Sequence, residues 1–182
     1  MVLCIVHSAK YNSAIAVVSS VIYGSSTIIL YLISCIYHAL KVNNGKRVFR
    51  ILDHCSIYLQ IAGTYTPYAL VALPPLTGWI IFGVNWACAI VGIVLNAVNL
   101  DKYKKISMVL YLVMGWMIIF GMKDVFVSVA KPGIILMFAG GIFYTIGAII
   151  YGLGKKKKYM HSVFHIFCIE ASILFFFSIY RY

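Results

Sequence analysis

The chain has 182 residues, of which 63% are hydrophobic and only 10% are charged, and its mean hydropathy is +0.98. A soluble domain carries about a quarter charged residues, and no soluble core of this size could bury so much apolar surface. The composition therefore excludes a soluble globular domain. It indicates an all-α, polytopic transmembrane helix bundle that forms a single membrane domain.

The first ten residues, MVLCIVHSAK, are too short to cross a bilayer. They lack the basic n-region and the small-residue cleavage site of a signal peptide. We expect residues 1–9 to be the remnant of a first helix whose beginning is missing.

Six apolar stretches follow, and apolar stretches of about 20 residues cross membranes as helices. They cover residues 14–40, 51–73, 79–99, 106–122, 132–154 and 159–180. A tight break at Pro74-Pro75 separates the second stretch from the third. Together with the remnant, these stretches predict a seven-helix type of bundle in which the first helix is largely missing and six spans are complete.

The basic residues are concentrated in short predicted loops between the apolar stretches. The chain has 15 Lys and Arg against 4 Asp and Glu, and three short segments, 41–50, 100–105 and 154–159, hold 11 of those 15. This placement argues against a nucleic-acid partner and for contact with anionic lipid headgroups. Since all three segments fall on one side of the predicted bundle, we expect them in the cytoplasm, at the cell membrane, with the C-terminus outside. The five cysteines form no C-x-x-C pair and predict no disulfide framework.

Five polar residues stand at the ends of apolar stretches that border the basic segments. Ser34-x-x-x-His38 ends one stretch, Asp53 begins the next, and His161-x-x-x-His165 begins the last. Residues four apart share one face of a helix, and ionisable residues inside membranes are functional candidates. Three imidazoles and a carboxylate at one depth predict a zinc site.

Each of these residues has an expected role. His38, His161 and His165 would bind zinc and leave the fourth position to water. Asp53 would orient that water or accept its proton, and Ser34 would donate a hydrogen bond to an oxyanion. Two alternatives remain open: a single membrane histidine can serve only as an interhelical hydrogen-bond partner, and Ser34 can bond its own backbone.

Three segments resemble the hemolysin III family, the bacterial branch of the progestin and adipoQ receptor superfamily. They are YLISCIYHAL (31–40), RILDHCSIYLQIAGTYTPY (50–68) and MHSVFHIF (160–167). The resemblance runs from about residue 15 to the end and implies a seven-helix fold. It also implies a zinc ion near the cytoplasmic face, with the same three histidines as ligands and with Asp53 and Ser34 beside it.

The chain departs from the family pattern in two places. Its first helix is nearly absent, together with the Glu and His usually found near the start of that helix. Glu170 stands where a small residue is expected, and it lies five residues beyond His165, off that face of the helix and deeper. The sequence assigns Glu170 no role.

Three functions remain for comparison. The first is a zinc-dependent hydrolase of lipid amides, because alkaline ceramidases share this constellation and adiponectin receptors are similar to them. The second is a non-enzymatic membrane sensor or regulator of lipid or membrane homeostasis, in which zinc is structural. The third is a cytolysin, which the absence of a secretion signal disfavours.

Overall fold

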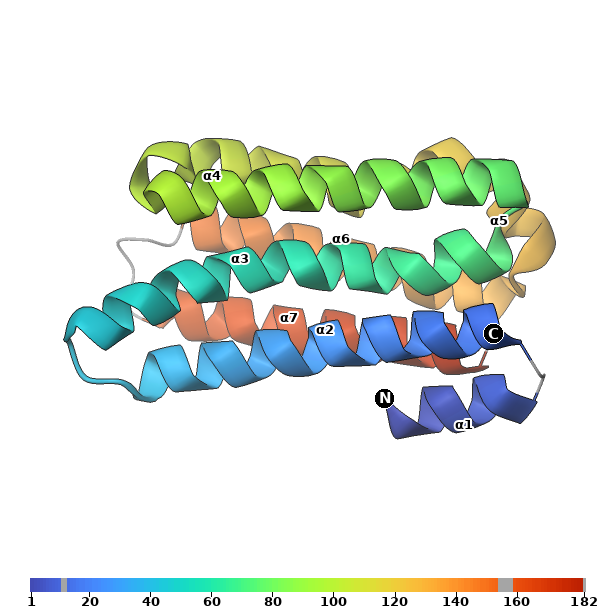
Figure 1. The fold of residues 1–182 in the computed structure, drawn as a ribbon, viewed down its shortest axis with the longest axis horizontal. Coiled ribbons are helices and arrows are strands. Elements are labelled where there is room, and N and C mark those ends of the chain that lie inside the picture. Colours follow the sequence, from blue (N-terminus) through green and yellow to red (C-terminus); the bar gives the residue numbers. More distant parts are fainter. Residues whose placement is uncertain (11–12, 154–158, 182) are drawn as a thin grey trace. The chain divides into compact units, whose positions relative to one another are not determined.

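The computed structural model describes residues 1–10, 13–153 and 159–181. Within these residues the regular structure is entirely helical, which agrees with the all-α prediction. The chain forms two compact units, Met1–Gly121 and Met122–Tyr182 (Figure 1). The predicted four-lysine segment, Lys155–Lys158, lies outside the described residues.

The first unit is built from four α-helices and two short helical turns of other types. These are α1 (Val2–Lys10), α2 (Ala14–Ala39), α3 (Asn44–Pro67), the π-helical turn η1 (Tyr68–Ala72), α4 (Pro75–Gly115) and the 3-10 turn η2 (Met117–Gly121). The second unit consists of α5 (Met122–Ser128), α6 (Lys131–Leu153) and α7 (Met160–Arg181).

Local chemistry explains where several helices begin. The Ser13 side chain accepts a hydrogen bond from the backbone N–H of Ala16 at the start of α2, and Asn43 Oδ1 accepts one from Lys46 N–H at the start of α3. Pro75 opens α4 at a position where its missing N–H costs nothing. Because Asn43 caps α3 this early, most of the basic segment 41–50, expected to be a loop, is helical.

Helix α4 is interrupted at Asn99, whose backbone is extended (φ −159°, ψ 90°). Asn99 Oδ1 accepts a hydrogen bond from the N–H of Lys102 and so caps a new helical start. Across this interruption, Ser107 Oγ donates a hydrogen bond to Asn96 Oδ1, and Asn85 Nδ2 donates one to the carbonyl oxygen of Met114. The two halves of α4 therefore lie side by side and run antiparallel. The basic segment 100–105, also expected to be a loop, is therefore the first turn of the returning helix.

Among the described residues, four helical stretches are long and apolar enough to cross a membrane: Ala14–Ala39, Pro75–Ser128, Lys131–Leu153 and Met160–Arg181. Helix α3 is less apolar, and the side chains of Ser56, Gln60, Thr64 and Thr66 on it are buried. The chain is therefore a multi-pass membrane protein, and the total of six spans remains a prediction.

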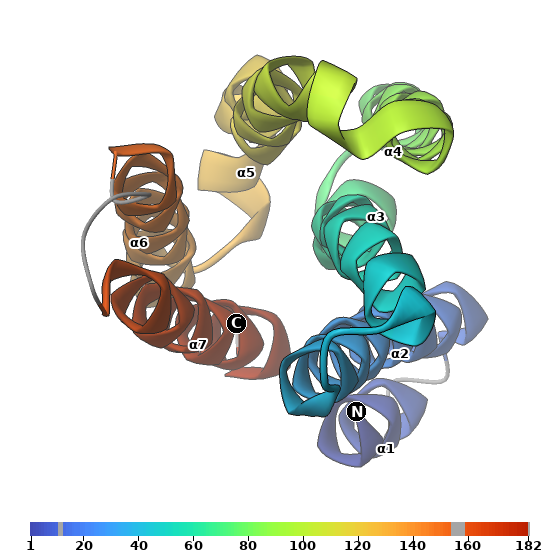
Figure 2. The same ribbon diagram turned by 90° about the vertical axis from the view of Figure 1, so that its left-hand side faces the viewer.

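Close approach of helices builds the interior of each unit (Figure 2). In the first unit, Tyr58 and Ala62 of α3 pack with Ala89 and Met114 of α4. The Tyr58 ring lies against Gly92, where a side chain would collide with it. Because lipid tails are as apolar as the helices, this kind of tight packing, rather than the hydrophobic effect, holds membrane helices together.

Candidate metal centre

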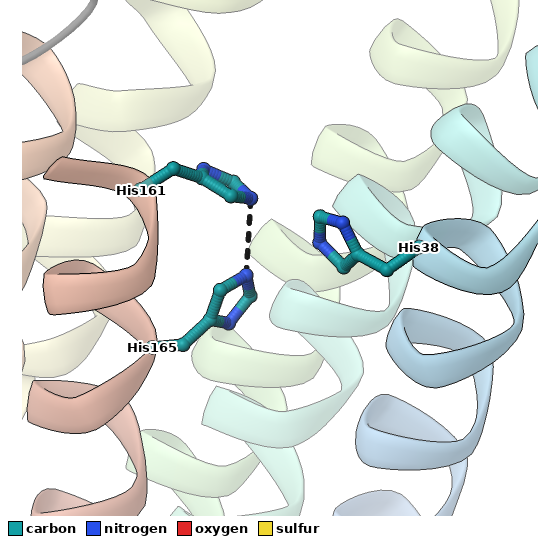
Figure 3. Close-up of side chains that lie close together, drawn as sticks. All are labelled: His38, His161 and His165. Carbon is teal, nitrogen blue, oxygen red and sulfur yellow. Dashed lines mark hydrogen bonds between the residues drawn. The ribbon is translucent and has the colours of Figure 1, made fainter. Parts of the chain in front are cut away.

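His161 and His165 lie one turn apart in the first turns of α7, and their side chains meet. The two Nε2 atoms are 3.0 Å apart, and the ring planes are perpendicular, with centroids separated by 4.6 Å (Figure 3). The i, i+4 spacing thus places both imidazoles on one face, as the sequence predicts. His161 is exposed and His165 is half-buried, so both nitrogens can be reached from outside the helix.

Aromatic rings support this histidine pair. The Tyr151 ring of α6 lies 6.0 Å from the His161 ring and 5.1 Å from the Phe164 ring, and Phe164 lies 5.2 Å from His165. The contact between Tyr151 and His161 joins the end of α6 to the beginning of α7. These rings pack around the two imidazoles and so restrict their orientations.

His38 stands in the last turn of α2, with Ser34 one turn earlier on the same face. The His38 side chain is exposed and contacts the Tyr37 ring, with centroids 4.8 Å apart. Lys46 closes this end of α2, because its Nζ donates to the carbonyl oxygen of Leu40 at 2.8 Å and lies 5.3 Å from the centre of the Tyr37 ring.

Asp53 lies on α3, and the packing of α2 against α3 fixes its depth. Gly63 of α3 sits against Ser26 of α2. The two helices are antiparallel and rise equally per residue, so Asp53, ten residues before Gly63, is about level with residue 36, ten residues after Ser26. The first unit therefore brings Asp53 to the depth between Ser34 and His38. The Asp53 side chain is half-buried, and its backbone carbonyl accepts from Ser56 Oγ at 2.7 Å.

A chain of hydrogen bonds that the sequence did not predict holds the backbone next to Asp53. Ser107 Oγ donates to Asn96 Oδ1 at 2.6 Å, and Asn96 Nδ2 donates to the Tyr111 hydroxyl at 3.3 Å. Tyr111 in turn donates to the carbonyl oxygen of His54 at 2.7 Å. The signal for this network was an asparagine inside an uncharged stretch, since Asn96 is fully buried and buried amides find partners.

An ion pair lies beside this network, outside the apolar stretches. Arg50 Nη2 is 2.6 Å from Asp101 Oδ1. The hydrogen bond from Arg50, followed by its positive charge, lowers the pKa of Asp101 below the ordinary value. The pair ties the first turns of α3 to the turn after Asn99. Sequence reasoning missed it because 51 residues separate the two side chains.

Comparison with known proteins places the chain in a family. Residues 1–176 match the family described as Haemolysin-III related. The chain belongs to this family. Hemolysin-3 of Bacillus cereus is 37% identical over 182 residues, which cover the whole of this chain and 83% of the relative. Its homologue in Bacillus subtilis (strain 168) is 36% identical over 182 residues, again the whole chain and 85% of the relative.

A more distant relative is human. The monocyte to macrophage differentiation factor of Homo sapiens is 24% identical over 173 residues, which cover 88% of this chain and 68% of that protein. No solved structure gives a significant match. The relatives agree with the resemblance drawn from the three motifs, and they connect the chain to the wider superfamily.

Proposed function

We propose that the chain is a zinc-dependent hydrolase of lipid amide bonds, with its site near the cytoplasmic face of the cell membrane. The observation that carries this proposal is the meeting of His161 and His165 through their Nε2 atoms, 3.0 Å apart. Two imidazole nitrogens aimed at each other from one helix face are the donor arrangement of helical zinc motifs. As the sequence predicts, His38 would supply the third imidazole.

The residues present fit zinc. Tetrahedral zinc with Zn–N distances of about 2.0–2.1 Å separates two ligand nitrogens by about 3.4 Å, so a small rotation of either ring suffices. Three neutral imidazoles with a nearby carboxylate suit zinc better than the harder magnesium and calcium ions, which prefer oxygen ligands. Tyr151 and Phe164 shield one side of the histidine pair.

Each of the remaining residues would have a role in hydrolysis. A bound zinc ion would supply Lewis acidity and an acidified water. The Asp53 carboxylate would accept a proton from the attacking water and pass it to the leaving amine. The Ser34 hydroxyl would donate a hydrogen bond to the oxygen that gains negative charge. Tyr111 of α4, bonded to the carbonyl of His54, would hold the backbone next to Asp53 in place.

The substrate class follows from the setting of these residues. Asp53 and Ser34 lie on membrane helices near a basic end that holds Lys46 and Arg50, where anionic lipid headgroups would gather. An amide-linked lipid would place its polar linkage at this depth and its tails along apolar helices. The resemblance to alkaline ceramidases supports the amide, and we propose that the basic segments face the cytoplasm.

Metal analysis of the purified protein, together with a lipid-amide cleavage assay, tests this proposal. We expect about one zinc per chain in the wild type and in His7→Ala, a matched histidine variant on α1. His161→Ala should lose both zinc and cleavage, and Asp53→Asn should keep zinc but lose cleavage. A folded wild type without zinc would overturn the metal site. Zinc without cleavage of any ceramide-like amide would overturn the hydrolase and favour a regulator with structural zinc.

A further inference from the structure

Glu170 occupies a position on α7 that the proposed chemistry does not use. It is the eleventh of the 22 residues of this apolar helix, so about 16 Å of helix separates it from either end. A glutamate side chain is too short to reach the membrane surface from there. A carboxyl group at this depth needs a polar partner inside the bilayer.

The fold of the second unit turns Glu170 away from both α6 and the histidines. Helix α7 packs on α6 through Ala171 and Phe175, which lie against Gly140, and through Ser178, whose hydroxyl donates to the carbonyl of Gly133 at 2.8 Å. Glu170 precedes buried Ala171 by one residue and so points about 100° away from it. Nine residues separate it from His161, which places the two side chains about 180° apart around the helix.

The face that carries Glu170 is exposed and otherwise apolar. Its exposed neighbours are Ile166, Ile169, Ile173 and Phe177, and Glu170 itself is exposed. Beyond Lys131 at its start, the exposed large side chains of α6 are all apolar: Ile135, Ile142, Ile146, Ile149 and Leu153. The outer face of α6 is therefore suited to contact with lipid tails. The outer face of α7 combines large apolar side chains with the Glu170 carboxyl group, to which lipid tails offer no hydrogen bond.

We propose that this face of α7 binds the same face of a second copy of the chain, with the two Glu170 carboxyl groups paired at the centre. A protonated carboxyl both donates and accepts a hydrogen bond, so the group is complementary to its own copy across a two-fold axis. Ile166 and Ile173, one turn on either side, would pack around the pair and exclude lipid. Hydrogen bonds between polar side chains on neighbouring helices stabilise the association of membrane helices.

The first unit offers Glu170 little alternative among its exposed residues. The exposed large side chains midway along α2 are Ile28, Ile29 and Leu32, and those midway along the first half of α4 are Ile90, Val91 and Val94. Within the described residues, the amides of Gln60 and Asn85 are buried inside that unit. A second copy of α7 is the surface that matches both the carboxyl group and its apolar surroundings.

Counting of subunits in lipid vesicles tests the pairing. The full chain, fused to a fluorescent protein and reconstituted at increasing dilution in neutral phosphatidylcholine vesicles, should show two copies per complex. Glu170→Gln retains a donor and an acceptor and should behave like the wild type. Glu170→Leu should weaken association by at least about tenfold, and the matched outer-face change Ile142→Leu on α6 should have no effect.

Two results would overturn the proposal. One is a wild type that stays monomeric at every dilution. The other is a Glu170→Leu variant that associates like the wild type. Thermal unfolding of the dilute monomers tests whether Glu170 instead has its partner within the same chain. In that case Glu170→Leu would lower the melting temperature of the monomer without changing association. Neither readout depends on zinc or on cleavage, so the pairing and the proposed hydrolase can fail independently.

Discussion

Arg50 donates to Asp101 from two nitrogens, Nη2 to Oδ1 at 2.6 Å and Nη1 to Oδ2 at 3.5 Å. This pair joins the beginning of α3 to the turn at which α4 reverses. Three residues farther along α3, Asp53 lies at a depth between Ser34 and His38 of α2. The ion pair and the Asn96 network therefore attach the acid of the proposed site to the α4 hairpin from two sides.

Acid should release the ion pair. The pKa of Asp101 is lower in the folded protein than its ordinary value of 3.8. The contribution of the ion pair to folding stability is therefore fully present above pH 3.8 and is lost as the pH falls through the pKa of the folded state. We expect Asp101→Asn to lower the melting temperature slightly at pH 7, because both partners are exposed to solvent. At pH 3 the difference from the wild type should shrink, and an undiminished difference there would contradict the assignment.

Removal of the Tyr65 hydroxyl should destabilise the first unit. This hydroxyl donates to the carbonyl of Gly115 at 2.6 Å and accepts from the N–H of Ile118 at 3.0 Å, where α4 gives way to η2. Tyr65→Phe leaves two backbone groups without this partner, and we expect a loss of about 2 kcal/mol in unfolding free energy. Denaturant unfolding in detergent measures it, with Tyr159→Phe as a control at an exposed tyrosine.

Two glycines of α4 should respond differently to substitution by alanine. A Cβ at Gly92 would collide with the Tyr58 ring, whereas a Cβ at Gly83 meets nothing within 4 Å. Gly92→Ala should therefore lower the melting temperature by forcing α3 and α4 apart. Gly83→Ala should leave stability unchanged or raise it by up to about 1 kcal/mol, because alanine favours helix. Equal effects would show that α3 and α4 do not approach this closely.

Ser34 should affect turnover and not metal content. If its hydroxyl stabilises the developing oxyanion, Ser34→Ala should reduce kcat by about 100-fold while zinc per chain stays at the wild-type value. Cys35→Ala changes the next residue, which is exposed and turned about 100° away, and should have no such effect. If Ser34→Ala kept full kcat, the hydroxyl would have no role in catalysis and would only hydrogen-bond to the backbone of its own helix.

Much of the fold could be predicted because its signals are local. The apolar stretches at 14–40, 132–154 and 159–180 agree closely with α2, α6 and α7, since hydropathy and length report directly on membrane helices. The basic segments were harder to interpret. They were expected as loops, but the Asn43 and Asn99 side chains cap helices within them, and capping overrides a high local charge.

The sequence by itself determined the membrane class, the family and the shared face of His161 and His165, because composition and the 3.6-residue period of a helix are local properties. Only the tertiary structure decided that Asp53 lies at a depth between Ser34 and His38, that Arg50 pairs with Asp101, and that Glu170 turns away from α6. These relationships depend on the axial register and rotation of whole helices against one another. Close contacts between distant residues, such as Gly63 with Ser26 and Gly140 with Phe175, set that register and rotation.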